Sequence, residues 1–264
     1  MINNSAFSRI YRPCVNPHGC AAQICYLFAV SSRQRDILPA KAYTYSFIHS
    51  LDEDTITIMG KYFGTDGFRG EAGVTLTADH AYKVGRFLGW YYNMLRERNG
   101  DTNPARIVIG KDTRRSSYMF EYSLVAGLTA SGADAYLLHV TTTPSVAYIA
   151  RVDDFDCGIM ISASHNPYYD NGIKLIDCYG EKMPEEILLL MEDYIDGKLH
   201  VFDKNWPELP FAHREHIGCT VDYVSGRNRY MGYLISLGIY SFKGVKVGLD
   251  CANGSSWNIA KSVF

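Results

Sequence analysis

The chain has 264 residues, of which 47% are hydrophobic and 20% are charged, and its formal net charge at pH 7 is −2. This length allows one large or two small domains with buried cores, and the composition is that of an ordinary globular protein. The balanced charge gives no sign of the basic patch that a nucleic-acid partner requires, so we expect no such partner.

The first 58 residues differ from the rest of the sequence. Residues 1–58 carry no sustained helical or strand periodicity, and we expect a poorly ordered extension outside the folded domain. The apolar stretch at 20–30 has about half the length of a membrane-spanning helix, so we expect no membrane partner. That stretch, preceded by Arg9 and Arg12, could alternatively be the core of a secretion signal, although no clean cleavage site follows it.

Residues 59–220 alternate strand-like and helix-like segments, which predicts one layered α/β domain. Ser116 or Ser117 can cap the first predicted helix, and Pro144 stands at the permissive first turn of the next. Asp170-Asn171-Gly172 predicts a tight turn after the third strand and therefore a mixed sheet. Strands are expected at 105–109, 135–140, 157–162 and 173–176, and helices are expected at 116–130, from 144 onward, and at 185–195.

Residues 221–264 begin a second unit of the same kind. A helix is expected at 223–237 and a strand at 245–249, and a further helix starts near the end of the chain. One strand and a fragment of helix cannot bury themselves. We therefore expect a sequence that stops inside a second domain.

A polar loop, Ser162-Ala163-Ser164-His165-Asn166-Pro167, leaves the end of the third predicted strand. The chemistry of open α/β sheets is concentrated in loops at the carboxyl ends of strands. Serine, asparagine and proline are also common turn residues for local reasons, so an ordinary polar loop is the alternative interpretation.

Ordered motifs across about 200 residues decide between these interpretations, because the chain resembles the α-D-phosphohexomutase superfamily. The resemblance implies a three-layer α/β/α first domain with a mixed sheet, followed by the start of a second domain. The sequences of the motifs are closest to those of the phosphoglucosamine mutases, with Phe68 standing where isoleucine is expected. The motifs are KYFGTDGFRG at 61–70, IGKDTRRSS at 109–117, TTTPSV at 141–146, ISASHNPYYDNGIKL at 161–175 and VGLDCANGSS at 247–256.

The resemblance implies that Ser164 carries a phosphoryl group and donates it to a hexose phosphate, so that a bisphosphate sugar forms as intermediate. A dianionic phosphoserine needs cations close by, and Arg69 and Lys174 are the candidates. His165 is a candidate acid/base, with orientation of the loop as its alternative role. Asn166, Lys111 and Arg114 complete the expected phosphate- and substrate-binding set, although the two basic residues could equally be solvated surface residues.

The superfamily resemblance also implies Mg²⁺, bound through the phosphate of Ser164 and by three aspartates of a DGDGDR-type loop. No such loop occurs in the sequence, so only the Ser164 ligand is expected here. The sugar-reading loop is missing as well, and we expect little or no mutase activity from this chain alone. The resemblance further implies a bacterial cytoplasm.

Three functions remain open at this stage. The first is a phosphoglucosamine mutase that interconverts glucosamine 6-phosphate and glucosamine 1-phosphate. The second is a phosphomannomutase or phosphoglucomutase of the same superfamily. The third is a non-enzymatic domain that binds sugar phosphates, or a subunit that needs a partner chain.

Overall fold

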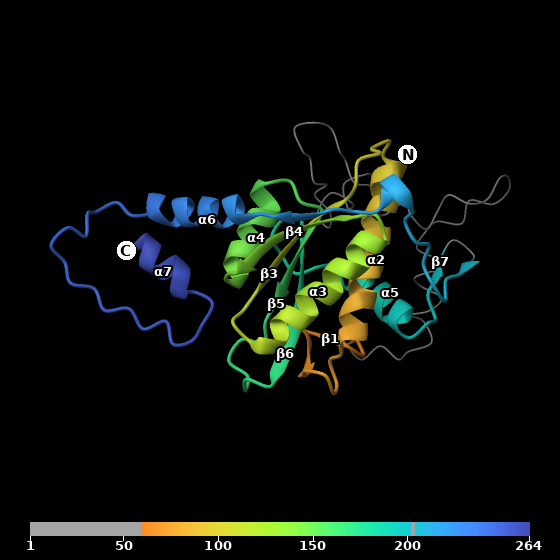
Figure 1. Cartoon of the computed structure of the whole chain (residues 1–264), viewed down its shortest axis with the longest axis horizontal. Helices are drawn as coiled ribbons and strands as arrows, with labels where there is room; N and C mark the ends of the chain where they lie inside the picture. Colours follow the sequence, from red (N-terminus) through yellow and green to blue (C-terminus); the bar gives the residue numbers. More distant parts are fainter. Residues whose placement is uncertain (1–59, 202–203) are drawn as a thin grey trace, which may run out of the picture. The chain divides into compact units, whose positions relative to one another are not determined.

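The computed structural model describes residues 60–201 and 204–264 (Figure 1). The extension expected at 1–58 lies outside these residues. The described elements of the main unit are β1 (Phe63–Gly64), β2 (Gly67–Glu71), α2 (Ala78–Arg98), β3 (Arg106–Lys111), α3 (Arg115–Ala130), β4 (Asp134–Val140), α4 (Thr143–Val152), β5 (Cys157–Ile161), β6 (Asp170–Asp177), α5 (Glu185–Ile195), a 3₁₀ turn (Arg214–His216), β9 (Thr220–Asp222), α6 (Val224–Ser236) and α7 (Trp257–Val263).

A mixed seven-stranded sheet forms the centre of this unit, in the order β1-β2-β6-β5-β3-β4-β9. β3 is parallel to β4 and β5, and β4 is parallel to β9. β6 is antiparallel to both β5 and β2, which are its two neighbours. The expected mixed sheet is thereby confirmed. Strands β7 (His200–Val201) and β8 (Lys204–Asn205) pair antiparallel in a different compact unit.

Helices cover both faces of the large sheet (Figure 1). On one face Val108, Met160 and Ile176 pack in a cluster with Val146 and Ile149 of α4. On the other face α3 lies against β3, β4 and β5, and α2 packs on α3 and α5. This arrangement is the three-layer α/β/α architecture that the motifs imply.

α2 is absent from the expected elements, although its sequence carries the helical signal. Its buried residues include Val84, Phe87, Leu88 and Tyr91, which recur at helical spacing. Thr77 caps its first turn by accepting a hydrogen bond from the backbone N–H of His80.

The start of α3 differs from the expected cap at Ser116 or Ser117. α3 begins at Arg115, and its N-cap residue Arg114 makes no side-chain cap hydrogen bond. Ser117 lies buried in the first turn, where its hydroxyl donates to Asp112 Oδ1 at 2.6 Å. The expected proline in the first turn of α4 is confirmed.

The turn expected at Asp170-Asn171-Gly172 is wrong, because these residues begin strand β6. The connection between β5 and β6 is instead the segment 162–169, which we call the serine loop. Asn171 is fully buried, and its side-chain amide donates to Ser116 Oγ and Ser117 Oγ at 2.9 Å each. The polar side chain is therefore satisfied in the interior and needs no turn.

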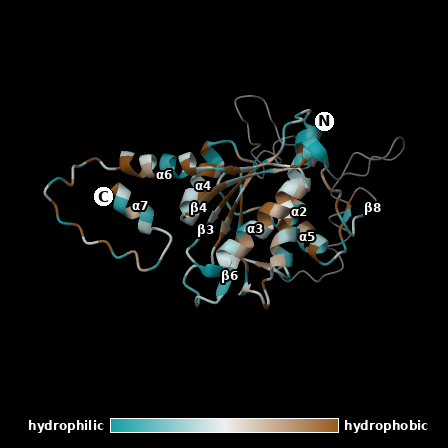
Figure 2. Cartoon of the chain, in the orientation of Figure 1, coloured by the Kyte–Doolittle hydropathy of each residue, from teal (hydrophilic) through white to brown (hydrophobic). Residues whose placement is uncertain are grey.

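The strand expected at 245–249 is also wrong. These residues pair with no other strand in the described part of the chain, and a strand requires such a ladder. Val245, Val247 and Leu249 are 59%, 44% and 45% exposed. Figure 2 shows hydrophobic residues both along the central strands and in this C-terminal segment. The helix expected just before it is confirmed as α6.

No helix within residues 60–201 and 204–264 combines the length and the apolar character needed to cross a bilayer.

Candidate functional site

The first element of the candidate site along the chain is the tight hairpin formed by β1 and β2. Gly64 pairs with Gly67 across a two-residue turn made of Thr65 and Asp66. Gly67 has a φ of 91°, and a Cβ there would lie 2.5 Å from the carbonyl oxygen of Ile173. Only glycine combines this backbone conformation with so close an approach to β6.

Glu192 of α5 fixes the segment that enters the hairpin. Its carboxylate accepts backbone hydrogen bonds from Lys61, Tyr62 and Phe63, at 2.7, 2.8 and 2.7 Å. Glu192 is only 7% exposed, so these bonds are largely sheltered from water. The hairpin is thereby tied to a helix of the folded domain.

Arg69 lies on strand β2, and it stands opposite Gly172 of β6 in the antiparallel ladder. Its Nη2 atom lies 3.1 Å from Asp66 Oδ2. Its Nε atom is buried and has no hydrogen-bond partner among the described residues. A buried N–H without a partner is costly.

Lys174 is two residues after Gly172, so it projects from the same face of β6 as the residue opposite Arg69. Burial lowers the pKa of Lys174, and the positive charge of Arg69 lowers it further. Lys174 also lines a cavity of ≈ 210 Å³ together with Thr65, Asp66 and Gly67. Lys174 therefore lies beside an open space, and the positive charge of Arg69 acts on it.

Ser164 lies in the serine loop, which leaves the buried strand β5. The loop starts where the N–H of Ser162 donates to the carbonyl of Gly172 at 2.8 Å. Two residues later Ser164 is exposed, and its N–H donates to Ser162 Oγ at 3.0 Å. Its φ of 56° is in the left-handed region, which is uncommon for serine and recurs at functional sites.

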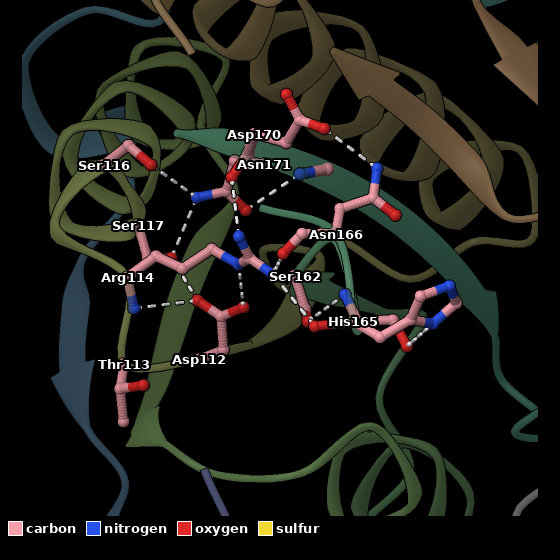
Figure 3. A network of polar contacts seen from close by, with 12 residues as sticks. Asp112, Thr113, Arg114, Ser116, Ser117, Ser162, His165, Asn166, Asp170 and Asn171 are labelled. Carbon is pink, nitrogen blue, oxygen red and sulfur yellow. Dashed lines mark hydrogen bonds and ion pairs between the residues drawn. The ribbon is translucent and has the colours of Figure 1, made fainter. Parts of the chain in front are cut away.

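His165 and Asn166 follow Ser164 and differ in what they contact (Figure 3). His165 is exposed, and its Nδ1 atom lies 3.4 Å from Ser164 Oγ, at the long end for a hydrogen bond. The side-chain amide of Asn166 donates to Asp170 Oδ2 at 3.0 Å. His165 thus stands beside the hydroxyl, whereas Asn166 fastens the loop to the start of β6.

Arg114 reaches the same loop from the N-terminus of α3 (Figure 3). Its Nη2 atom donates to the carbonyl oxygens of Ser164 and Asn166 at 2.9 Å each. Its Nη1 atom donates to the carbonyl oxygens of Pro167 and Asp170. The arginine expected to bind phosphate therefore binds the backbone of the loop.

The main unit of the chain matches a known protein family. Residues 60–199 match the family model of phosphoglucomutase/phosphomannomutase, alpha/beta/alpha domain I. The chain belongs to this family. It is 72% identical over 206 residues to a phosphoglucosamine mutase of Lachnospira eligens and 66% identical to one of Lachnoclostridium phytofermentans. Each of these alignments covers 78% of this chain and 43% of the relative, so the chain spans less than half the length of either.

A solved structure supports the fold. A phosphoglucomutase/phosphomannomutase family protein from Burkholderia thailandensis matches with a TM-score of 0.55 at 21% identity, over 78% of this chain and 42% of the other. At this identity the likeness concerns the three-layer fold alone.

Among the expected site residues of this phosphohexomutase domain, Lys111 has its side chain engaged away from the serine loop. Its side chain is 2% exposed, and its ammonium pairs with Glu121 of α3, which is 1% exposed. The ammonium also lies 3.8 Å from the centre of the Tyr118 ring. Lys111 therefore ties α3 to the sheet, and we do not propose it as a phosphate contact.

We expect Glu121→Ala to lower the free energy of unfolding by about 3–5 kcal/mol, because it leaves the Lys111 ammonium buried and unpaired. Combining Glu121→Leu with Lys111→Met should cost much less, since both charges then leave the interior together. Chemical denaturation measures both, with Glu97→Ala on the exposed face of α2 as the control. Equal losses in the single and the double variant would contradict the buried pair.

The described residues of this domain offer no cluster of side chains that would bind Mg²⁺. No group of three or more His, Cys, Asp or Glu side chains within residues 60–201 and 204–264 could hold a metal ion. The two carboxylates at the serine loop are engaged, Asp112 by Arg114 and Ser117, and Asp170 by Asn166. These residues do not form a magnesium site by themselves.

Proposed function

We propose that this chain carries the phosphoryl-accepting half of a phosphoglucosamine mutase, with Ser164 as the residue that takes and returns the phosphoryl group. The observation that carries the proposal is the exposed Ser164 hydroxyl in the loop between β5 and β6, with Arg69 on the adjoining strand β2 and Lys174 on β6. Arg69 has a buried Nε atom with no partner among the described residues, and Lys174 has a lowered pKa. Both are features of a place prepared for an anion.

The proposed transfer forms a bond between Ser164 Oγ and phosphorus while the bond between phosphorus and a sugar oxygen breaks. The serine proton passes to the leaving sugar oxygen, directly or through His165, so that charge and atoms balance. The reverse step returns a phosphoryl group to the other hydroxyl of the hexose. Little covalent work falls to the protein, and its task is positioning and charge stabilisation by Arg69 and Lys174.

Glucosamine phosphate is the proposed sugar, because relatives at 72% and 66% identity are named phosphoglucosamine mutase. Mannose or glucose phosphate is the second candidate, favoured by the description of the matching family model. We further propose that the chain acts in the bacterial cytoplasm, in the supply of amino-sugar precursors. Mg²⁺ remains an expectation from the family resemblance, in which the phosphate of Ser164 would be one of its ligands.

Transfer of a phosphoryl group from a bisphosphate sugar to Ser164 tests the proposal on this chain. The chain is incubated with glucosamine 1,6-bisphosphate, and intact mass and peptide mapping locate any phosphoryl group. We expect one group on Ser164, which a hexose 6-phosphate removes. An unmodified Ser164 would contradict the proposal.

The lowered pKa of Lys174 makes the anion site sensitive to pH. An anion favours the charged lysine, so we expect the affinity for inorganic phosphate to fall as pH rises through the lowered pKa of Lys174, below the range of an ordinary lysine. Lys174→Arg should remove this alkaline loss, because the guanidinium stays charged. Calorimetric titration across the alkaline range measures both chains, and an identical pH profile in the two would contradict the assignment.

A further inference from the structure

We infer that Arg114 is a positioning residue that holds Ser164 in its reactive backbone conformation by binding the carbonyl groups of the serine loop, and that it contacts no phosphate. This inference rests on the proposed role of Ser164 and assigns a different task to an arginine that the sequence places in the phosphate-binding set.

All the hydrogen-bonding capacity of the Arg114 guanidinium is used within the chain. The group has five N–H donors in a planar fork. Four of them point at the carbonyl oxygens of Ser164, Asn166, Pro167 and Asp170. The fifth, on Nε, donates to Asp112 Oδ2 at 2.9 Å. No donor is left over for a phosphate oxygen.

Asp112 fixes the orientation of this guanidinium. Besides the Nε bond, its carboxylate accepts the backbone N–H of Arg114 at 3.1 Å and the hydroxyl of Ser117 at 2.6 Å. The side chains of Asp112 and Arg114 are only 11% and 10% exposed, so the ion pair is little screened by water. Figure 3 shows the arginine between this carboxylate and the loop.

Further hydrogen bonds connect the serine loop, α3 and the start of β6. Ser117 also accepts the side-chain amide of Asn171, and the backbone N–H of Gly172 donates to Asn171 Oδ1 at 2.8 Å. A Cβ on Gly172 would lie 2.8 Å from the carbonyl oxygen of Ser162, so the loop and β6 are in close contact there. Arg114 thus joins the loop to the buried side chains of Asp112, Ser117 and Asn171.

Ser164 is the residue that needs this support. A serine with positive φ keeps that conformation only where its surroundings determine it. The Ser164 carbonyl oxygen is held by Arg114, and its N–H is held by Ser162 Oγ. The two peptide groups that flank the Ser164 Cα atom are therefore both fixed, and the direction of the side chain follows from them.

The neighbouring Arg115 provides the matched control, because it has the same chemistry one position later and is exposed. Lysine cannot replace Arg114, since one ammonium with three donors cannot reach four carbonyls and a carboxylate in fixed directions. Arg114→Lys therefore removes the fork but keeps the charge, whereas Arg115→Lys should change nothing.

Amide hydrogen exchange on the whole chain is the first readout, and it does not depend on any phosphoryl transfer. We expect exchange in peptides covering 162–171 to rise at least about tenfold in Arg114→Lys, with peptides of α2 and β4 unchanged. Unchanged exchange in the loop would overturn the inference. If Arg114→Lys unfolds the domain as a whole, Asp112→Asn, which keeps the arginine, should still raise exchange in the loop, and an unaffected loop would again overturn it.

Phosphorylation of Ser164 by glucosamine 1,6-bisphosphate is the second readout. We expect Arg114→Lys to slow the maximal rate by about 100-fold, as for a misplaced reacting group, while the half-saturating concentration stays the same. Guanidinium ion added to Arg114→Ala should restore part of the rate. A raised half-saturating concentration with an unchanged maximal rate would overturn the inference and mark Arg114 as a phosphate ligand. If the wild-type chain accepts no phosphoryl group, the proposed function fails, and the exchange measurement decides the role of Arg114 alone.

Discussion

A Ser164→Ala chain will acquire no phosphoryl group from a hexose bisphosphate, whereas the wild-type chain will acquire one. The substitution removes the oxygen to which the new bond would form. It keeps the backbone N–H and C=O groups that Ser162 and Arg114 hold, so the loop should retain its shape. Because Ser164 is exposed, we expect the free energy of unfolding to change by no more than about 0.5 kcal/mol.

Intact-mass spectrometry over a time course measures this uptake, and Ser123→Ala on α3 is the control for loss of a serine elsewhere. Among the described residues, Ser123 donates only to the carbonyl of Met119 within its own helix, so its loss should leave phosphorylation unaffected. Phosphate acquired by the Ser164→Ala chain at the wild-type rate would transfer the proposed role to another residue of the chain.

The strands and helices of the central sheet could largely be predicted because their signals are local. β3, β4 and β5 are short apolar runs, and their ends lie within two residues of the expected positions. β9 spans only Thr220–Asp222 and carries no such signal, and it exists because β4 offers a parallel partner. Pairing between distant segments is what a local pattern cannot supply.

The candidate site shows the same division between local and distant information. The exposed Ser164 at the end of β5 follows from the order of strand and loop. The position of Lys111 does not, because burial of its ammonium depends on Glu121 one helix away. Asn171 and Gly172 have the composition of a turn but serve in a strand, since Ser116, Ser117 and the close approach of the loop satisfy them instead.

Arg69→Ala is expected to slow the phosphorylation of Ser164 by at least about 100-fold, which is the usual cost of losing one preorganised donor to a developing charge. Arg69 brings a positive charge and a buried Nε–H that no described residue accepts. The phosphorylation rate of Arg69→Lys should lie between those of the wild-type chain and Arg69→Ala, because lysine restores the charge but not the planar fork. Arg151→Ala, an exposed arginine at the end of α4, is the control.

A second readout separates this role from a loss of stability. The charge of Arg69 lowers the pKa of Lys174, so Arg69→Ala should raise the pKa of Lys174 toward the ordinary lysine value. Burial of Lys174 persists in the variant, and the rise should therefore be incomplete. NMR titration of isotopically labelled lysines measures it. A slower reaction with no change in the pKa of Lys174 would mean that Arg69 acts from outside the shared anion site, and the two-cation arrangement proposed here would then be wrong.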